Sequence, residues 1–189
     1  MNLPNKLTIG RLGLTAVFFV LLGLGHPEAG AAGRWLLNIS LALYIIAAFT
    51  DLVDGWLARK YGMVTDFGRV ADPFADKILV CGALIFLLTK AGTPVRDWMV
   101  VIIIAREFIV SGMRTLAESK NIPFGATHWG KFKALSQNFA VGFSIFYIAN
   151  DLTVIEPIVV GILYLATAMT AVSGLIYLFR AKRILHIDT

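Results

Sequence analysis

Four aspartates with regular spacing are the residues of this chain best suited to chemistry. Asp51 and Asp54 end one apolar run, and Asp72 and Asp76 begin the next. Residues three or four apart share one face of an α-helix, so each pair presents two carboxylates together. Carboxylates at the ends of hydrophobic spans are costly unless they are paired, hydrated or bound to a cation. The four side chains therefore predict a site for hard divalent cations such as Mg²⁺ or Mn²⁺, which prefer oxygen ligands.

Small and basic residues between the two aspartate pairs favour a phosphate ligand beside the metal. Gly55 would let a ligand approach the backbone closely, and Ala58 leaves the next turn of that helix face open. Arg59, on the same face, offers a planar guanidinium suited to phosphate. We expect residues 65–68 to turn the chain back, with Gly68 again removing a side chain from the site.

The aspartates also have structural interpretations. Asp72 precedes Pro73, as in a helix N-cap followed by a first-turn proline, and this role is compatible with metal binding. Asp51 or Asp54 could instead pair with Arg59 or Lys77, or lie in interfacial water. The spacing of all four carboxylates, with glycines and an arginine between the pairs, favours the metal site.

Other metal and thiol chemistries have little support in the sequence. Zinc and copper sites usually need His or Cys ligands, and the three histidines are scattered, at His26, His128 and His186. The single cysteine, Cys81, excludes an intrachain disulfide and a C-x-x-C site.

The rest of the sequence predicts a membrane protein that positions these residues. Hydrophobic residues make up 58% of the 189 residues, charged residues make up 15%, and the mean hydropathy is +0.76. Such a chain is too apolar for an ordinary soluble domain. We expect an all-α protein, a single domain over residues 1–189, with six transmembrane helices in one bundle. The predicted spans are 8–25, 34–56, 75–92, 97–116, 134–150 and 154–179.

Positive charges are concentrated on one side of these spans. Of the 17 Lys and Arg residues, thirteen fall on the side of the termini, three fall on the other side, and Arg106 lies within a span. The positive-inside rule then makes both termini cytoplasmic and places the predicted loops 57–74 and 117–133 together on that face. This distribution suits anionic lipid headgroups and phosphate ligands, and no motif supports nucleic-acid binding. Small residues in the spans would also permit a homodimer.

The acidic segment resembles a family signature. Its pattern is D-x2-D-G-x2-A-R-x8-G-x3-D-x3-D, filled without a departure from Asp51 to Asp76. This pattern is similar to the signature of the CDP-alcohol phosphatidyltransferases. The resemblance implies a core of six membrane helices and two divalent cations, Mg²⁺ or Mn²⁺. These ions would clamp the pyrophosphate of a CDP-linked lipid while an alcohol displaces CMP.

The resemblance also implies roles for individual residues. Asp51, Asp54 and Asp72 would be metal ligands, and Asp76 would contribute to the second metal and take the proton from the acceptor hydroxyl. For Asn5, a helix-start role after Pro4 is the alternative to nucleotide binding. The CDP-lipid would be held by eight residues of the amino-terminal segment and the signature: Pro4, Asn5, Thr8, Gly55, Ala58, Arg59, Thr65 and Gly68.

A second segment bears on the acceptor alcohol. The sequence A105-R-E-F-I-V-S-G-M-R114, followed by G130-K-F-K133, resembles the phosphatidylglycerophosphate synthases, whose acceptor is sn-glycerol 3-phosphate. An acceptor that carries a phosphate needs basic residues beside the metal site, and the candidates are Arg106, Arg114, Lys131 and Lys133. The two lysines could instead be ordinary cytoplasmic loop charges. Arg106 and Glu107 lie in an apolar run, so they should face the bundle interior and either contact ligand or form a structural ion pair.

The expected reaction is a direct displacement. The primary hydroxyl of glycerol 3-phosphate would attack the phosphorus that carries diacylglycerol in CDP-diacylglycerol, giving phosphatidylglycerophosphate and CMP. The resemblance implies a bacterial inner membrane, with the active site on its cytoplasmic side. A sister enzyme that uses inositol phosphate, serine or another alcohol is the nearest alternative. A cation transporter is a distant one, because the acids cluster at one end of the spans and no polar path continues through them.

Overall fold

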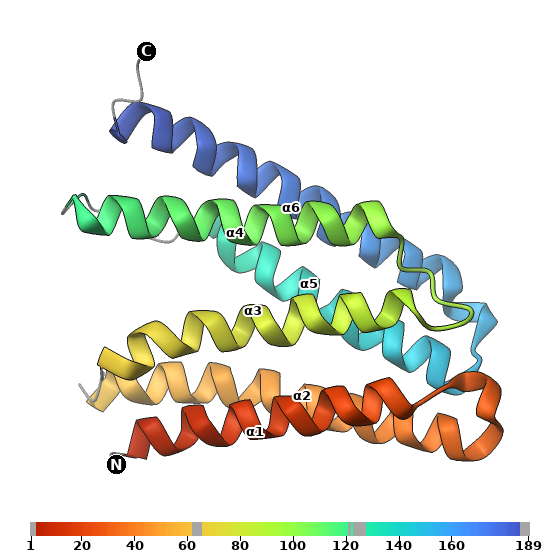
Figure 1. The fold of residues 1–189 in the computed structure, drawn as a ribbon. Helices are drawn as coiled ribbons and strands as arrows, with labels where there is room; N and C mark the ends of the chain where they lie inside the picture. The colour runs from red at the N-terminus through yellow and green to blue at the C-terminus, as the bar shows by residue number, and fades with distance from the viewer. Residues whose placement is uncertain (1–2, 62–65, 121, 123–127, 186–189) are drawn as a thin grey trace.

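Six long α-helices form the part of the chain that the computed structural model describes (Figure 1). The backbone is described for residues 3–61, 66–120, 122 and 128–185, and the side chains for residues 9–50, 74–120, 122 and 130–181. No β-strand occurs in these residues, which confirms the all-α prediction. The elements are α1 (Leu3–Leu24), the 3₁₀ turn η1 (Pro27–Ala29), α2 (Gly30–Tyr61), α3 (Asp66–Leu88), α4 (Asp97–Ser119), α5 (His128–Asn150), the 3₁₀ turn η2 (Thr153–Ile155) and α6 (Glu156–Leu185).

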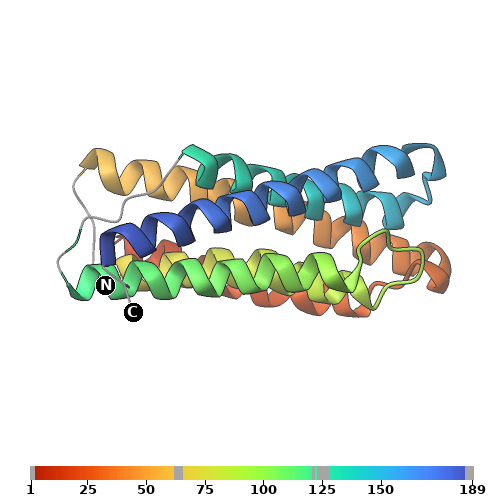
Figure 2. The same ribbon diagram turned by 90° about the horizontal axis from the view of Figure 1, so that it is seen from above.

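The helices run alongside one another in an elongated bundle (Figures 1 and 2). Helix α1 packs on α2 and α3, α5 packs on α2 and α6, and α4 packs on α6. Both views place the start of α1 and the end of α6 at the same end of the bundle, here called the terminal end. The end of α2 and the start of α3 lie there too, so the backbone of the aspartate signature is gathered at the terminal end.

Large apolar side chains fill the space between the helices. Phe18 of α1, Leu37 of α2, Leu84 of α3 and Ile145 of α5 are all at most 1% exposed. Close packing of such side chains gains many small dispersion contacts, which hold helices together even where the surroundings are lipid. Gly82 of α3 contributes by its small size, because a Cβ atom there would collide with the ring of Phe19.

Polar contacts secure the end of the bundle opposite the terminal end. The Nζ atom of Lys90 donates hydrogen bonds to the carbonyl oxygens of Gly23, at 2.9 Å, and Gly25, at 2.6 Å. The last carbonyls of a helix have no partner within it, so this lysine caps the end of α1. Arg34 of α2 forms a 3.1 Å ion pair with Asp151, which follows α5. These contacts join neighbouring helices where the chain reverses.

The outer surface of the bundle is strongly apolar. Trp35, Phe108 and Phe179 are each at least 70% exposed, and many other large apolar side chains are exposed. Two segments are long and apolar enough to cross a membrane in the described residues, Pro27–Thr50 and Thr153–Ala181, and Ile9–Leu24 is a shorter apolar segment. A surface of this kind is typical of a protein whose solvent is lipid.

The predicted loops at the terminal end were too long. Helix α2 continues to Tyr61 and α3 begins at Asp66, so most of the predicted loop 57–74 is helical. Asp72 and Pro73 therefore lie inside α3 rather than at its N-cap, and residues 66–68 belong to its first turn rather than to a reversal of the chain. Loop 117–133 is shorter as well, since α4 ends at Ser119 and α5 begins at His128. Apolarity marks the segments suited to lipid, whereas helical hydrogen bonding of the backbone continues into the polar segments beyond them.

Candidate functional site

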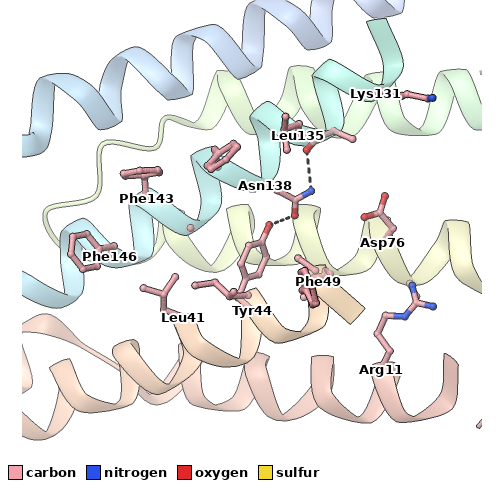
Figure 3. A pocket seen from close by; sticks show the side chains of 17 residues that line it. Arg11, Leu41, Tyr44, Phe49, Asp76, Lys131, Leu135, Asn138, Phe143 and Phe146 are labelled. Carbon is pink, nitrogen blue, oxygen red and sulfur yellow. Dashed lines mark hydrogen bonds between the residues drawn. The ribbon is translucent and has the colours of Figure 1, made fainter. Parts of the chain in front are cut away.

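A cavity of about 860 Å³, here called the large cavity, lies between α2, α3 and α5 (Figure 3). Helix α1 contributes one residue to its lining. Its charged lining residues, Arg11, Asp76 and Lys131, lie at one end of the cavity. Its other end is apolar, with side chains that include Leu41, Phe143 and Phe146. A cavity with a charged end and a long apolar remainder suits a molecule with a charged headgroup and a hydrocarbon tail.

Asp76 is the aspartate of the signature whose side chain the structure describes. It is half-buried and shares the charged end of the cavity with Arg11, which is 4% exposed, and with Lys131, which is exposed. The two cationic side chains can hold phosphate oxygens. The carboxylate of Asp76 can hold a cation or accept a proton from a hydroxyl group. Both kinds of partner are needed for transfer of a phosphate group to an alcohol.

Most other predicted metal-binding and CDP-binding residues have no described side chains. The backbone places residues 51–59 in the last turns of α2 and Asp72 one turn before Asp76 in α3. Among the side chains that are described, no group of three acidic, histidine or cysteine residues gathers. The predicted metal centre therefore remains a prediction. The predicted residues outside the described side chains are Asp51, Asp54, Asp72, Pro4, Asn5, Thr8, Gly55, Ala58, Arg59, Thr65 and Gly68.

The two predicted phosphate-binding lysines have different surroundings. Lys131 lines the large cavity and is exposed, whereas Lys133 is 5% exposed and forms an ion pair with Glu107 of α4. Lys133 is thus a paired interior charge and not an ordinary loop charge.

The two predicted phosphate-binding arginines lie between α4 and α6. Arg106 Nη1 donates to Glu107 Oε1 at 3.3 Å, and its Nη2 donates to Ser173 Oγ at 2.7 Å. Arg114 Nη2 donates to the hydroxyl of Tyr177 at 2.8 Å. Each guanidinium also lies 5.4 Å from the centre of the Tyr177 ring. The prediction that Arg106 and Glu107 face the interior is confirmed, and of the two predicted alternatives the structure shows the ion pair.

Asp76 borders both the large cavity and a second cavity that is lined by charged residues of α4 and α5. This second cavity is much smaller, and it is lined by Asp76 together with Glu107 and Lys133. We call Arg106, Glu107, Arg114 and Lys133 the basic cluster: Glu107 pairs with Arg106 and Lys133, and Arg114 lies further along α4 beside Tyr177. The Nε atom of Arg106 is buried and has no hydrogen-bond partner among the described residues. The cluster therefore keeps a net positive charge and an unused donor, both suited to an anionic ligand.

Sequence reasoning missed Arg11 and the pair formed by Tyr44 and Asn138. Arg11 is a charge inside an apolar run, and that was the available signal for it. Tyr44 Oη donates to Asn138 Oδ1 at 2.8 Å, and both residues line the large cavity. An asparagine inside the predicted span 134–150 was the available signal.

Comparison with known proteins adds a family and several relatives. The family model described as CDP-alcohol phosphatidyltransferase matches residues 1–178. The chain is 38% identical over 178 residues to the CDP-diacylglycerol–glycerol-3-phosphate 3-phosphatidyltransferase of Bacillus subtilis (strain 168), covering 92% of this chain and 91% of that protein. It is 34% identical over 184 residues to the protein of the same name from Rickettsia bellii (strain RML369-C), covering 96% of each. A probable phosphatidylglycerophosphate synthase of Mycobacterium tuberculosis (strain ATCC 25618 / H37Rv) is 36% identical over 184 residues, covering 96% of this chain and 82% of that protein.

Proposed function

Because this chain belongs to the CDP-alcohol phosphatidyltransferase family, we propose that it transfers a phosphatidyl group from CDP-diacylglycerol to sn-glycerol 3-phosphate. The products are phosphatidylglycerophosphate and CMP. The large cavity carries the proposal, because its charged end suits a pyrophosphate and its apolar remainder suits an acyl chain. Relatives that match nearly the whole chain are named for transfer to glycerol 3-phosphate, which supports the choice of acceptor.

In this proposal the six helices cross a bacterial inner membrane, with both termini and the active site on the cytoplasmic side. The excess of Lys and Arg in the loops and helix ends on the same side of the spans as the termini supports this orientation. The apolar outer surface supports insertion in lipid. The charged end of the large cavity then lies near the cytoplasmic headgroups, where nucleotide and glycerol 3-phosphate are both available.

The lipid substrate enters the large cavity from the side of the bundle. Phe49, Leu135 and Phe139 line the cavity and are each more than half exposed, so its apolar wall is continuous with the outer surface. A lipid can therefore bind while part of its hydrocarbon remains in the bilayer, which avoids the cost of exposing it to water.

Two divalent cations, Mg²⁺ or Mn²⁺, would be held by Asp51, Asp54, Asp72 and Asp76. Two observations support this ligand set. All four residues are carboxylates, which such ions prefer, and helices α2 and α3 bring the backbone of these four residues to the terminal end of the bundle. When bound, the ions supply positive charge that neutralises the pyrophosphate and the leaving CMP.

The protein's own side chains position the substrates and move the proton. Arg11 and Lys131 hold phosphate oxygens at the charged end of the cavity. Asp76 takes the proton of the primary hydroxyl of glycerol 3-phosphate. The hydroxyl oxygen forms a bond to the phosphorus that carries diacylglycerol, and the bond from that phosphorus to the bridging oxygen of CMP breaks.

The basic cluster binds the phosphate of the acceptor. Arg106, Arg114 and Lys133 supply three positive charges against the one negative charge of Glu107, and the cluster adjoins Asp76 through the small cavity. Lys131 contacts a phosphate from the side of the large cavity. The acceptor hydroxyl then lies between its own phosphate and the lipid phosphorus, beside the carboxylate that takes its proton.

The test is an assay of CMP release by the purified protein. It contains CDP-diacylglycerol, Mg²⁺ or Mn²⁺, and one acceptor at a time: glycerol 3-phosphate, inositol phosphate or serine. Release with glycerol 3-phosphate alone is expected. Release with serine or inositol phosphate but not glycerol 3-phosphate would overturn the acceptor assignment. The absence of CMP release with every acceptor, accompanied by cation flux in vesicles, would favour a transporter.

A further inference from the structure

One polar pair interrupts the apolar part of the large cavity. Beyond the charged end, Tyr44 of α2 and Asn138 of α5 are the polar residues among those that line it. Figure 3 places their hydrogen bond midway, with Arg11, Asp76 and Lys131 to one side and Phe143 and Phe146 to the other. A polar group in an apolar cavity is costly unless it has a partner, so its presence there needs a reason.

The hydrogen bonds of Asn138 define which of its atoms face which partner. Its Nδ2 atom donates to the carbonyl oxygen of Ala134 at 3.0 Å, and its Oδ1 atom accepts from Tyr44 at 2.8 Å. An amide nitrogen carries two hydrogens, and Ala134 uses one of them. The half-buried Asn138 therefore has one N–H left for a ligand that accepts a hydrogen bond.

Tyr44 is well placed to hold this amide in one orientation. It is 2% exposed, and its ring lies 5.5 Å from the ring of Phe18 in the core. Tyr44 thus belongs to the packed interior, and its hydroxyl supplies a fixed donor for Asn138. The backbone of α5 holds the amide on one side and this hydroxyl holds it on the other, which is the pre-organisation expected of a recognition group.

The position of Asn138 along α5 matches the depth of a lipid ester. It follows Lys131 by seven residues, about 10 Å along the helix axis at a rise of about 1.5 Å per residue. Phe146 lies a further eight residues on, about 12 Å deeper by the same rise. A lipid with its phosphates at Arg11 and Lys131 and an acyl chain directed toward Phe146 would place the ester carbonyl between them.

On the basis of the proposed function, we propose that Asn138 donates its remaining N–H to an acyl ester carbonyl of CDP-diacylglycerol, while Tyr44 holds the amide in place. An ether-linked lipid of the same length has no carbonyl there, so it would leave that N–H without a partner. The site would therefore prefer ester-linked over ether-linked lipid, by roughly tenfold for one such hydrogen bond.

The experiment measures kcat/KM for CDP-diacylglycerol and for its dialkyl ether analogue, with saturating glycerol 3-phosphate. The wild-type protein should prefer the ester roughly tenfold, mainly through KM because the contact is remote from the reacting phosphorus. The N138L variant should lose most of its activity on the ester and little on the ether, so the ratio falls toward one. The double variant N138L/Y44F should give the same ester-to-ether ratio as N138L. It removes both partners of the hydrogen bond, so no buried tyrosine hydroxyl is left unpaired.

Asn150→Leu is the matched control, because this asparagine lies at the far end of the same helix and bonds to Asn38 rather than lining the cavity. Its ester-to-ether ratio should equal that of the wild type. Equal use of both lipids by the wild type, or an unchanged preference in N138L, would overturn this inference and leave the proposed function intact. No CMP release from CDP-diacylglycerol with any acceptor would overturn both.

Discussion

Lys133 of α5 and Glu107 of α4 form an ion pair inside the bundle, and both side chains line a small cavity with Asp76. Glu107 also accepts a hydrogen bond from Arg106, so one carboxylate serves two cations. A buried pair of this kind does not by itself stabilise a protein strongly, but the loss of one partner leaves a charge without compensation. The pair therefore connects the stability of the bundle to the charge beside the proposed base.

Glu107→Gln should destabilise the protein by about 3–5 kcal/mol, because Lys133 and Arg106 would then be buried beside a neutral group. Denaturant or thermal unfolding in detergent measures the effect. Glu118→Gln on the exposed face of α4 is the control and should unfold like the wild type. Adding Lys133→Met to Glu107→Gln should recover part of the stability. Wild-type stability in Glu107→Gln would show that the ion pair does not form.

Lys131→Met should affect substrate binding alone, whereas Lys133→Met should affect both binding and stability. Lys131 is exposed at the cavity, so its loss should raise the KM of one substrate roughly tenfold or more, as expected for a hydrogen bond to a charged group, and leave unfolding unchanged. Lys133→Met should both destabilise the fold, because Glu107 loses one of its two cationic partners, and raise the KM of glycerol 3-phosphate. Steady-state kinetics with each substrate varied in turn, together with unfolding curves, checks both. The substrate whose KM rises identifies the phosphate that Lys131 contacts.

Asp76→Asn should lower kcat by about 10²–10⁴, the usual contribution of a general base, while the fold remains. CMP release in single turnovers measures the chemical step, and circular dichroism checks the helices. Asp97→Asn is the control, since this aspartate lies at the start of α4, does not line the large cavity, and accepts a hydrogen bond from the backbone of Trp98. Near-normal turnover in Asp76→Asn would remove Asp76 from the role of base.

Chelation of divalent cations should abolish CMP release, and added Mg²⁺ or Mn²⁺ should restore it, because carboxylates prefer such ions. Asp51→Asn and Asp72→Asn should each need a higher Mn²⁺ concentration for half-maximal binding. Titration of Mn²⁺, followed by its electron paramagnetic resonance signal, measures binding without turnover. Undiminished Mn²⁺ binding in both variants would contradict the predicted ligand set.

The sequence predicted the helices better than their ends. The six apolar spans each correspond to one observed helix, but α3 begins at Asp66 rather than near residue 75. Apolarity reports where lipid surrounds the chain, and backbone hydrogen bonding continues into the polar segments beyond it. The interpretation of Asp72 as an N-cap failed for this reason, since local spacing resembles a helix start without showing that the helix begins earlier.

The residues of the site were predicted unevenly for a different reason. The signature identified Asp76, and the cost of charge in an apolar run identified Arg106 and Glu107 as interior residues. The partners of these residues come from other helices, as with Arg106 and Ser173, which are 67 residues apart. Contacts over such separations depend on helix packing, which no local pattern records. Tyr44 and Asn138 were missed for the same reason, because their hydrogen bond joins two different helices.

The lateral opening of the large cavity determines which concentration governs the rate. If lipid arrives through the wall formed by Phe49, Leu135 and Phe139, the enzyme samples one leaflet in two dimensions. Turnover should then follow the mole fraction of nucleotide-activated lipid in the membrane rather than its amount per litre. Diluting that lipid with inert phospholipid would slow the reaction even when total substrate stays constant.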